Sequence, residues 1–327
     1  MKSKISNIAY HLPINSEDIN DLGIGNSDWD LVKIFEKTGI SKRWISQIDE
    51  TACDLAVHAL NKLFSSCHLS KKDVELIVFV SQSSDYFLPS TACIIQDIAG
   101  LPKSSMAFDV NLGCSGFVYA LSITGSLIES GVVKNGLIIC SDTYTKFISK
   151  NDKTCRPIFS DGAAAVLIER SGTENMGPFI FGTDGSGYDS LIVRNGGLRN
   201  FSNNKLQDIT LKMDGGSVFL FTINKIPIAI NELLNKAKIK LQDLDLIIFH
   251  QASKFVIDNL IEKLSLDSTK VFINYEFIGN TVSATIPIAL KDADDQGRLK
   301  NGDKVLLAGF GVGLSWGITL INWRPNK

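Results

Sequence analysis

Residues 106–128 carry the sequence that decides the fold, MAFDVNLGCSGFVYALSITGSLI. The apolar run Met106–Val110 predicts a strand, and the apolar run from Phe117 to Ile128 predicts a buried helix. Cys114 therefore lies at a strand-to-helix junction, where free backbone N–H groups and the helix dipole favour negative charge. We expect this placement to lower the pKa of the Cys114 thiol and to make it a nucleophile.

The overall composition is that of an ordinary globular protein, with 327 residues, 44% hydrophobic and 21% charged. A net charge of −2 gives no support for a nucleic-acid-binding surface. The N-terminus shows no signal-peptide core, and the longest apolar runs are too short to span a bilayer. We therefore expect a soluble, cytoplasmic protein without disulfides. No metal is expected, because no C-x-x-C pair or ligand cluster accompanies the six cysteines.

The two halves of the chain resemble each other. Residues 72–80 (KDVELIVFV) and 242–250 (QDLDLIIFH) each join an acidic turn to a short apolar run. Such runs are typical of strands that are buried on both faces of a parallel sheet. Residues 131–136 (GVVKNG) and 297–302 (GRLKNG) also match, and each precedes another expected strand. This pattern predicts an α/β protein that arose by duplication.

The spacing within the repeat pairs two polar residues. Cys114 stands 20 residues before Lys134, and Asn280 stands 20 residues before Lys300. The two therefore hold equivalent positions, each at the start of a helix, while His250 ends a buried strand. Sites in open α/β sheets form beyond the carboxyl ends of strands. Pairing of two such halves would bring Cys114, Asn280 and His250 to one cleft. Chance similarity is the alternative, and the shared spacing favours duplication.

We place the boundary between the halves at residue 172, so that residues 1–172 carry the cysteine and residues 173–327 carry the histidine and asparagine. Residues 182–204 are rich in Gly, Asn and Ser and are expected to form a long loop. The helix expected over residues 215–238 contains Pro227, which predicts a kink or a break.

Each candidate residue also has a purely structural explanation. Free cysteine usually only packs, which is our interpretation of Cys53, Cys67, Cys93, Cys140 and Cys155. His250 alone would be read as a hydrogen-bonded histidine at a strand end, and Asn280 alone as a helix N-cap. The glycines of residues 309–317 fit a tight strand crossing and no nucleotide-binding pattern.

Six motifs occur in the order seen in the ketoacyl-acyl-carrier-protein synthase III family, which the chain resembles over nearly its whole length. They are Thr38–Ile40, Pro89–Cys93, Gly113–Phe117, His250–Ala252, Gly279–Thr281 and Gly311–Gly317. Each motif alone is weak, but the order of all six is specific. The resemblance implies a thiolase-like fold, with two similar α/β halves in an α-β-α-β-α layering, and usually a homodimer. It implies no cofactor, since CoA or phosphopantetheine thioesters are the substrates.

The resemblance further implies an acyltransferase of fatty-acid or specialised acyl biosynthesis. Cys114 would take the acyl group from acyl-CoA or an acyl-carrier protein, with the backbone N–H groups of Cys114 and Val312 as oxyanion hole. His250 and Asn280 would hold the thioester carbonyl of malonyl-carrier protein and stabilise the enolate left when CO2 departs. Both are neutral donors, which suits that task. The product would be a β-ketoacyl thioester.

Substrate contacts are also implied by the resemblance. Phe87, Leu88 and Phe310 are expected walls of the acyl pocket, and Phe87 and Leu88 would reach the pocket of a neighbouring subunit. Lys37 and Lys153 are expected at a cationic rim for CoA or carrier-protein phosphate, although such residues are more often ordinary surface lysines.

The chain departs from the family where CoA is held. Ser253 and Phe255 stand where Asn and Arg are usual, and Lys33 and Lys153 replace the aromatic and Arg residues that grip the adenine. A carrier-protein donor or a specialised pathway is therefore an open alternative to fatty-acid initiation.

Three other functions compete with condensation. One is acyl transfer from the same cysteine to an O or N nucleophile of a sugar or metabolite. Another is a papain-like hydrolase, although Phe117 and the position of Cys114 deep in the chain do not match that local signature. The third is a non-catalytic scaffold that kept the fold.

Overall fold

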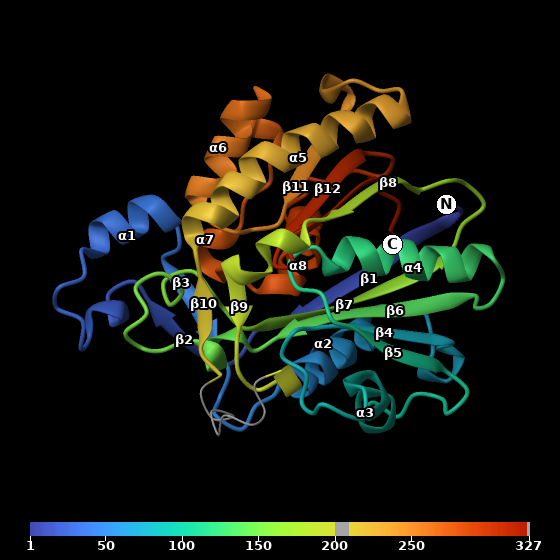
Figure 1. Ribbon diagram of the computed structural model, residues 1–327. Helices are drawn as coiled ribbons and strands as arrows, with labels where there is room; N and C mark the ends of the chain where they lie inside the picture. Colours follow the sequence, from blue (N-terminus) through green and yellow to red (C-terminus); the bar gives the residue numbers. More distant parts are fainter. Residues whose placement is uncertain (200–208, 326–327) are drawn as a thin grey trace.

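Two β-sheets form the centre of the protein, whose computed structural model describes residues 1–199 and 209–325 (Figure 1). The five-stranded sheet has the order β1 (Ser3–His11), β7 (Gly162–Arg170), β6 (Asn135–Asp142), β4 (Leu76–Val80) and β5 (Met106–Val110). The four-stranded sheet has the order β8 (Met176–Thr183), β13 (Ser315–Asn322), β12 (Lys304–Gly311) and β11 (Leu246–Phe249). The first sheet thus comes from the chain before residue 172 and the second from the chain after it.

The two sheets repeat the same pairing pattern. β4 and β6 run parallel, as do β11 and β12, and each pair is followed by two antiparallel neighbours. An isolated parallel bridge between Ile247 and Val271 stands beside β11, where β5 stands beside β4. The internal repeat in the sequence therefore corresponds to two sheets of matching topology.

Helices form three layers around and between the sheets. α4 (Gly116–Glu129) and α8 (Thr285–Asp295) lie between the sheets and contact strands of both. α2 (Ala52–Ser66) and α3 (Thr91–Ile98) pack on the outer face of the five-stranded sheet. α5 (Gly215–Ala237) and α6 (Lys254–Leu264) pack on the outer face of the four-stranded sheet. The expected α-β-α-β-α layering of two α/β halves is confirmed.

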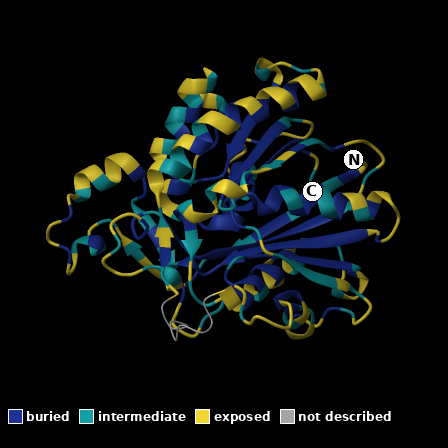
Figure 2. Cartoon of the chain, viewed as in Figure 1, coloured by how far each residue is buried: buried dark blue, intermediate teal, exposed yellow. Residues whose placement is uncertain are grey.

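The most deeply buried elements are the central strands of the sheets and the helices α4 and α8 between them. Figure 2 shows the strands and α4 as the largest dark-blue region, with exposed residues on the outer helices. The helix α4 is apolar on nearly every side, because it is covered by both sheets. Cys114, two residues before the start of α4, is consequently buried near the centre of the molecule.

Smaller elements surround one end of the sheets. They are the hairpin of β2 (Asn15–Asp18) and β3 (Lys42–Ile45), the helices α1 (Leu31–Thr38) and α7 (Tyr275–Ile278), and the pair β9 (Leu191–Val193) and β10 (Leu211–Met213). Glu17 of β2 binds both Arg43 and Arg156, which are buried, and this network ties the hairpin to residues 148–161. A charge shared between two buried guanidinium groups keeps that segment in place.

One expectation about the second half was wrong. Residues 182–204 are not one long loop, because β9 and the end of β8 lie within them; residues 200–204 fall outside the described chain. Of the kink or break expected at Pro227, the break does not occur, because α5 runs through this residue. Proline removes one backbone hydrogen bond, but Ile226 and Pro227 are buried against the sheet, and this packing holds the helix together.

α5 is also the one helix in the described ranges that is long and apolar enough to cross a membrane by length and composition. Its apolar residues Phe221, Ile226, Ile230 and Leu233 belong to the core over the four-stranded sheet. A core helix passes the same test, so the apolar character of α5 follows from its packing.

Candidate active site

The structure places Cys114 between the end of β5 and the start of α4, with Ser115 as the N-cap. The thiol is buried, and the side chain is only 5% exposed. β12 passes close by: a Cβ atom added to Gly309 would lie 2.6 Å from the Cys114 carbonyl oxygen, and one added to Gly311 would lie 3.0 Å from Sγ. The two glycines therefore allow the second half of the chain to reach the cysteine of the first.

The expected lowering of the thiol pKa is wrong. Burial and the nearby Asp142 carboxylate raise the pKa of Cys114 to about 12. The backbone N–H groups of Cys114 and Val312 act in the opposite direction but are outweighed. The position at a helix start is visible in the sequence, whereas the cost of desolvating a thiolate between the two sheets is not.

His250 follows β11 and points its ring into the same region. It is buried, and its backbone N–H donates to the carbonyl of Ala308 on β12 at 2.8 Å. Nδ1 lies 2.7 Å from Thr285 Oγ1, and the ring stands edge-on to Phe310. Burial lowers the pKa of His250 to about 3, so the imidazole is neutral at physiological pH.

Asn280 follows α7 and Gly279, in a segment that is bonded to the first half of the chain. Its N–H donates to the carbonyl of Ile158, and its own carbonyl accepts from Ser160 N–H. The side-chain orientation is fixed because Oδ1 accepts from Val282 N–H at 2.9 Å. The amide group Nδ2 consequently faces His250, with 3.4 Å between Nδ2 and Nε2.

A buried carboxylate holds the turn that follows Asn280. Asp142, at the end of β6, accepts from the N–H and hydroxyl of Ser283 and from the N–H of Gln82. Burial raises the pKa of Asp142 to about 6, against the opposing effect of these hydrogen bonds. Asp142 thereby connects the strand ends of the first half to the turn that follows Asn280 in the second.

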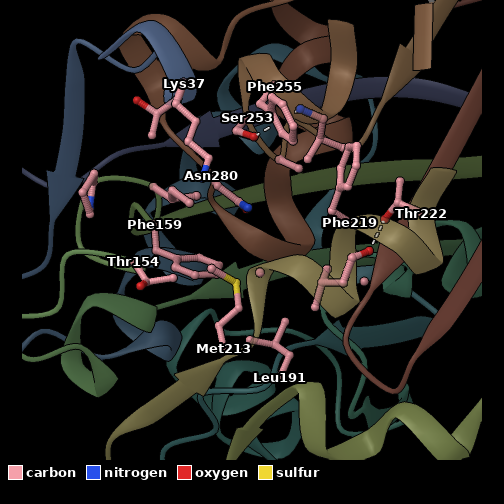
Figure 3. A pocket seen from close by; sticks show the side chains of 18 of the residues that line it. Lys37, Thr154, Phe159, Leu191, Met213, Phe219, Thr222, Ser253, Phe255 and Asn280 are labelled. Carbon is pink, nitrogen blue, oxygen red and sulfur yellow. Dashed lines mark hydrogen bonds between the residues drawn. The ribbon is translucent and has the colours of Figure 1, made fainter. Parts of the chain in front are cut away.

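All three predicted residues meet at one cavity of about 660 Å³. Figure 3 shows Asn280 and Phe159 in its centre, with Met213 and Leu191 on one side and Lys37 on the other. Cys114, His250 and Phe310 line the same space. One thiol, one neutral imidazole and one carboxamide thus share a largely apolar chamber, which can hold an acyl group and present it to a second reactant.

The remaining predicted contacts divide into two groups. Phe310, Lys37 and Lys153 line the cavity, and both lysines are exposed at its surface. Phe87 and Leu88 do not line it and are each 81% exposed. Any contact of these two residues with a pocket would have to be made in another subunit.

Several cavity residues had no signal in the sequence. Phe159, Leu191, Met213, Val218 and Phe219 come from four separate segments, and each looks like an ordinary core residue. Leu191 stood in the segment that was expected to be a loop, and Val218 and Phe219 stood in the expected helix over residues 215–238, but nothing marked them as cavity residues. An apolar wall lacks a motif, since any residue of suitable volume can build it.

Gly309→Ala is expected to destabilise the protein by about 1–3 kcal/mol, since overpacking a filled interior has this cost. The new Cβ would meet two backbone atoms of Cys114 and Ser115, at 2.6 and 2.9 Å, and neither can rotate away. Urea unfolding would measure the change. Gly172→Ala is the control, because nothing lies within 4 Å of its Cβ position. Equal stability of the two variants would contradict this account of β12.

Alkylation of Cys114 by iodoacetamide is expected to accelerate roughly tenfold per pH unit from pH 6 to 9, because the thiolate reacts and the pKa lies at about 12. A papain-like thiolate–imidazolium pair would instead give a rate that is already constant near pH 6. Peptide mass mapping would assign the label to Cys114. A plateau below pH 8 would overturn the neutral thiol and imidazole described above.

Comparisons with known proteins find one family of synthases that matches both halves of the chain. Residues 108–185 match the family described as 3-oxoacyl-[acyl-carrier-protein (ACP)] synthase III, and residues 234–323 match its C-terminal part. The chain is 36% identical over 331 residues to a protein of Clostridioides difficile (strain 630) named beta-ketoacyl-[acyl-carrier-protein] synthase III, with 98% of each chain covered.

Solved structures agree with the sequence matches. A crystal structure of a 3-oxoacyl-(acyl-carrier-protein) synthase III superposes with a TM-score of 0.94 at 37% identity, over 99% of this chain and 100% of that one. The priming beta-ketosynthase from the R1128 polyketide biosynthetic pathway superposes with a TM-score of 0.92 at 26% identity, over 99% and 97%. The likeness therefore extends over both halves.

Proposed function

The chain belongs to the 3-oxoacyl-[acyl-carrier-protein] synthase III family, and on this premise we propose that it is an acyltransferase that condenses an acyl thioester with malonyl-carrier protein. The observation that carries the proposal is the convergence of Cys114, His250 and Asn280 on one cavity. A thiol alone would support acyl transfer of any kind. The two neutral donors beside it, at 3.4 Å from each other, favour a reaction that develops an enolate.

In the first half-reaction, Cys114 Sγ attacks the carbonyl carbon of an acyl-CoA or acyl-carrier protein. The carbonyl oxygen becomes negative and accepts from the N–H groups of Cys114 and Val312, the two groups that already oppose the rise in the thiol pKa. The bond to the donor sulfur then breaks. The donor leaves as a thiol with the proton that Cys114 has lost, and the acyl group remains on Cys114.

In the second half-reaction, the malonyl thioester loses CO2 and the electron pair of the broken bond moves to its carbonyl oxygen. His250 and Asn280 donate to that oxygen. The enolate carbon attacks the acyl-Cys114 carbonyl and a carbon–carbon bond forms. The bond to Cys114 Sγ breaks, and the released thiolate takes up one proton from solvent. The pKa of about 3 for His250 supports a neutral donor, because an imidazolium would have to be formed at high cost in this buried site.

We also propose a homodimer built on the edge of the five-stranded sheet. β5 pairs only with β4, so its other edge is free within the described chain. Exposed apolar side chains lie on β5, on α3 and in the preceding loop: Met106, Ile98, Tyr86, Phe87 and Leu88. A second copy related by a twofold axis would pair β5 with β5 and cover this apolar surface. Phe87 and Leu88 would then be available to the partner's cavity.

The condensation is tested by supplying a panel of acyl-CoA and acyl-carrier protein donors together with malonyl-carrier protein. Intact mass would report the acyl adduct on Cys114, and CO2 release with a β-ketoacyl product would report condensation. An adduct that passes to an amine or alcohol without malonyl would instead identify acyl transfer. The absence of any adduct across the panel would contradict both condensation and acyl transfer, and would favour a non-catalytic scaffold. Sedimentation of the same sample would test the dimer.

A further inference from the structure

We propose that Thr285 is a positioning residue that donates its hydroxyl proton to His250 Nδ1 and so holds the imidazole with its proton on Nε2. The inference rests on the proposed function, because it assigns to His250 the role of a donor in the condensation. It adds a residue outside the predicted set, at the first position of α8.

The contact between the two side chains is short and buried. Thr285 Oγ1 lies 2.7 Å from His250 Nδ1, and both residues are 2% exposed. In residues 1–199 and 209–325, Nδ1 has no other hydrogen-bond partner. Because both side chains are buried, the direction of this hydrogen bond depends on the other neighbours of the hydroxyl and of the ring.

The hydroxyl has one proton and two acceptors within reach. The carbonyl of Val282 lies 3.1 Å from Oγ1, and His250 Nδ1 lies at 2.7 Å. If the proton goes to Val282, Nδ1 must donate to the hydroxyl and Nε2 is left with a lone pair. If the proton goes to Nδ1, the neutral ring carries its own proton on Nε2. The shorter distance favours the second arrangement.

Asn280 faces the other ring nitrogen, Nε2. Its Oδ1 already accepts from Val282 N–H, so the Nδ2 hydrogens face Nε2. The separation of 3.4 Å is long for a nitrogen–nitrogen hydrogen bond. This separation suits two donors to one substrate oxygen, because an oxygen can lie at about 2.9 Å from both nitrogens at once. With the imidazole proton on Nε2, His250 and Asn280 can each donate one hydrogen bond to that oxygen.

The turn from Asn280 to Thr285 is strained at Val282, and this strain helps to orient both side chains. Val282 has φ of +55°, which a β-branched residue rarely adopts and which costs about 1–3 kcal/mol. This conformation directs Val282 N–H to Asn280 and leaves its carbonyl near Thr285. Ser283, bonded through its N–H and hydroxyl to Asp142, holds the turn in place. Asp142 therefore supports the geometry of both donors.

The test uses Thr285→Val, which keeps the shape and removes the hydroxyl, and Thr285→Ser, which restores it. Partners that hold the second ring nitrogen of a metal-bound histidine typically contribute 10- to 100-fold, and we expect an effect of similar size here. Thr285→Val should lower condensation by about that factor and change acyl-Cys114 formation by less than about threefold, while Thr285→Ser restores condensation. Thr124→Val is the control, because the buried Thr124 hydroxyl has no hydrogen-bond partner among the described residues.

Nitrogen-15 spectra of histidine-labelled protein give a readout that a merely structural role would not move. We expect the Nε2–H tautomer of His250 in the wild type and a mixture in Thr285→Val, with assignment from a His250→Ala sample. The Nδ1–H tautomer in the wild type, equal losses in both half-reactions, or full condensation by Thr285→Val would each overturn the proposal. If the wild type fails to condense malonyl thioesters, the proposed function fails, while the spectra still decide the direction of the Thr285 hydrogen bond.

Discussion

Cys114→Ala should eliminate the acyl adduct and reduce condensation at least about a thousandfold, because it removes the only atom proposed to carry the acyl group. The expected loss is among the largest for this chain, since Tyr144 and Cys155 share the apolar surroundings of Cys114 but neither lines the cavity in the described part of the chain. Intact-mass measurement after incubation with acyl-CoA or acyl-carrier protein would detect the adduct, and product formation would be followed separately.

Cys67→Ala serves as the matched control for this prediction. Cys67 is also a free cysteine, but it lies at the end of α2, where its thiol donates to the carbonyl of Leu69. The variant should keep both the adduct and the product. Condensation at the wild-type rate in Cys114→Ala would exclude Cys114 as the nucleophile, whereas an adduct without product would leave Cys114 correct and place the error in the second half-reaction.

Asn280→Ala should lower condensation by about 100- to 1000-fold and leave acylation of Cys114 nearly unchanged. The magnitude is that of removing one donor to a developing oxyanion. The separation arises because Asn280 is directed at His250 and not at the backbone N–H groups that surround the thiol. Single-turnover kinetics would measure adduct formation and adduct consumption in the same sample.

Asn280→Asp sharpens this prediction, since it keeps the shape and replaces the donor by a negative charge. We expect a loss at least as large, because like charge would face the enolate oxygen. Asn61→Ala, on the exposed face of α2, is the control and should behave as the wild type. If Asn280→Ala slows acylation as much as condensation, the two donors serve the first half-reaction and the assignment of roles must be reversed.

Much of the fold could be read from local patterns. The strand at residues 106–110, the strand at residues 76–80 and the helix that reaches residue 128 were all predicted, and the structure confirms them. The strand at residues 76–80 and the helix are predictable because a segment buried on both faces must be apolar throughout its length. The strand at residues 106–110 is only partly buried, and its mostly apolar run made it predictable. Segments that are half-buried carry no such constraint, and β9 was accordingly missed among polar residues.

The chamber around the site was much less predictable. Its apolar wall comes from β9, β10, α5 and the residues before β7, which are brought together only by the tertiary fold. Thr285 was also missed, because a threonine at a helix start is common and its role depends on a histidine 35 residues earlier. Distance along the chain hides such a pair from any spacing argument.

By itself, the sequence indicated the two matching halves and the three polar residues that meet at the cavity, and its resemblance to a known family implied the layered α/β fold. It could do so because the spacing repeats in both halves, and the start of a helix after a strand is a local event. Only the tertiary structure decided the protonation of the site. Burial between two sheets raises the pKa of Cys114 and lowers that of His250, and hydrogen bonds from distant turns orient Asn280 and the imidazole. Desolvation and hydrogen bonding depend on every neighbour in space, and for Cys114 they outweigh the effect of the helix terminus that the sequence reveals.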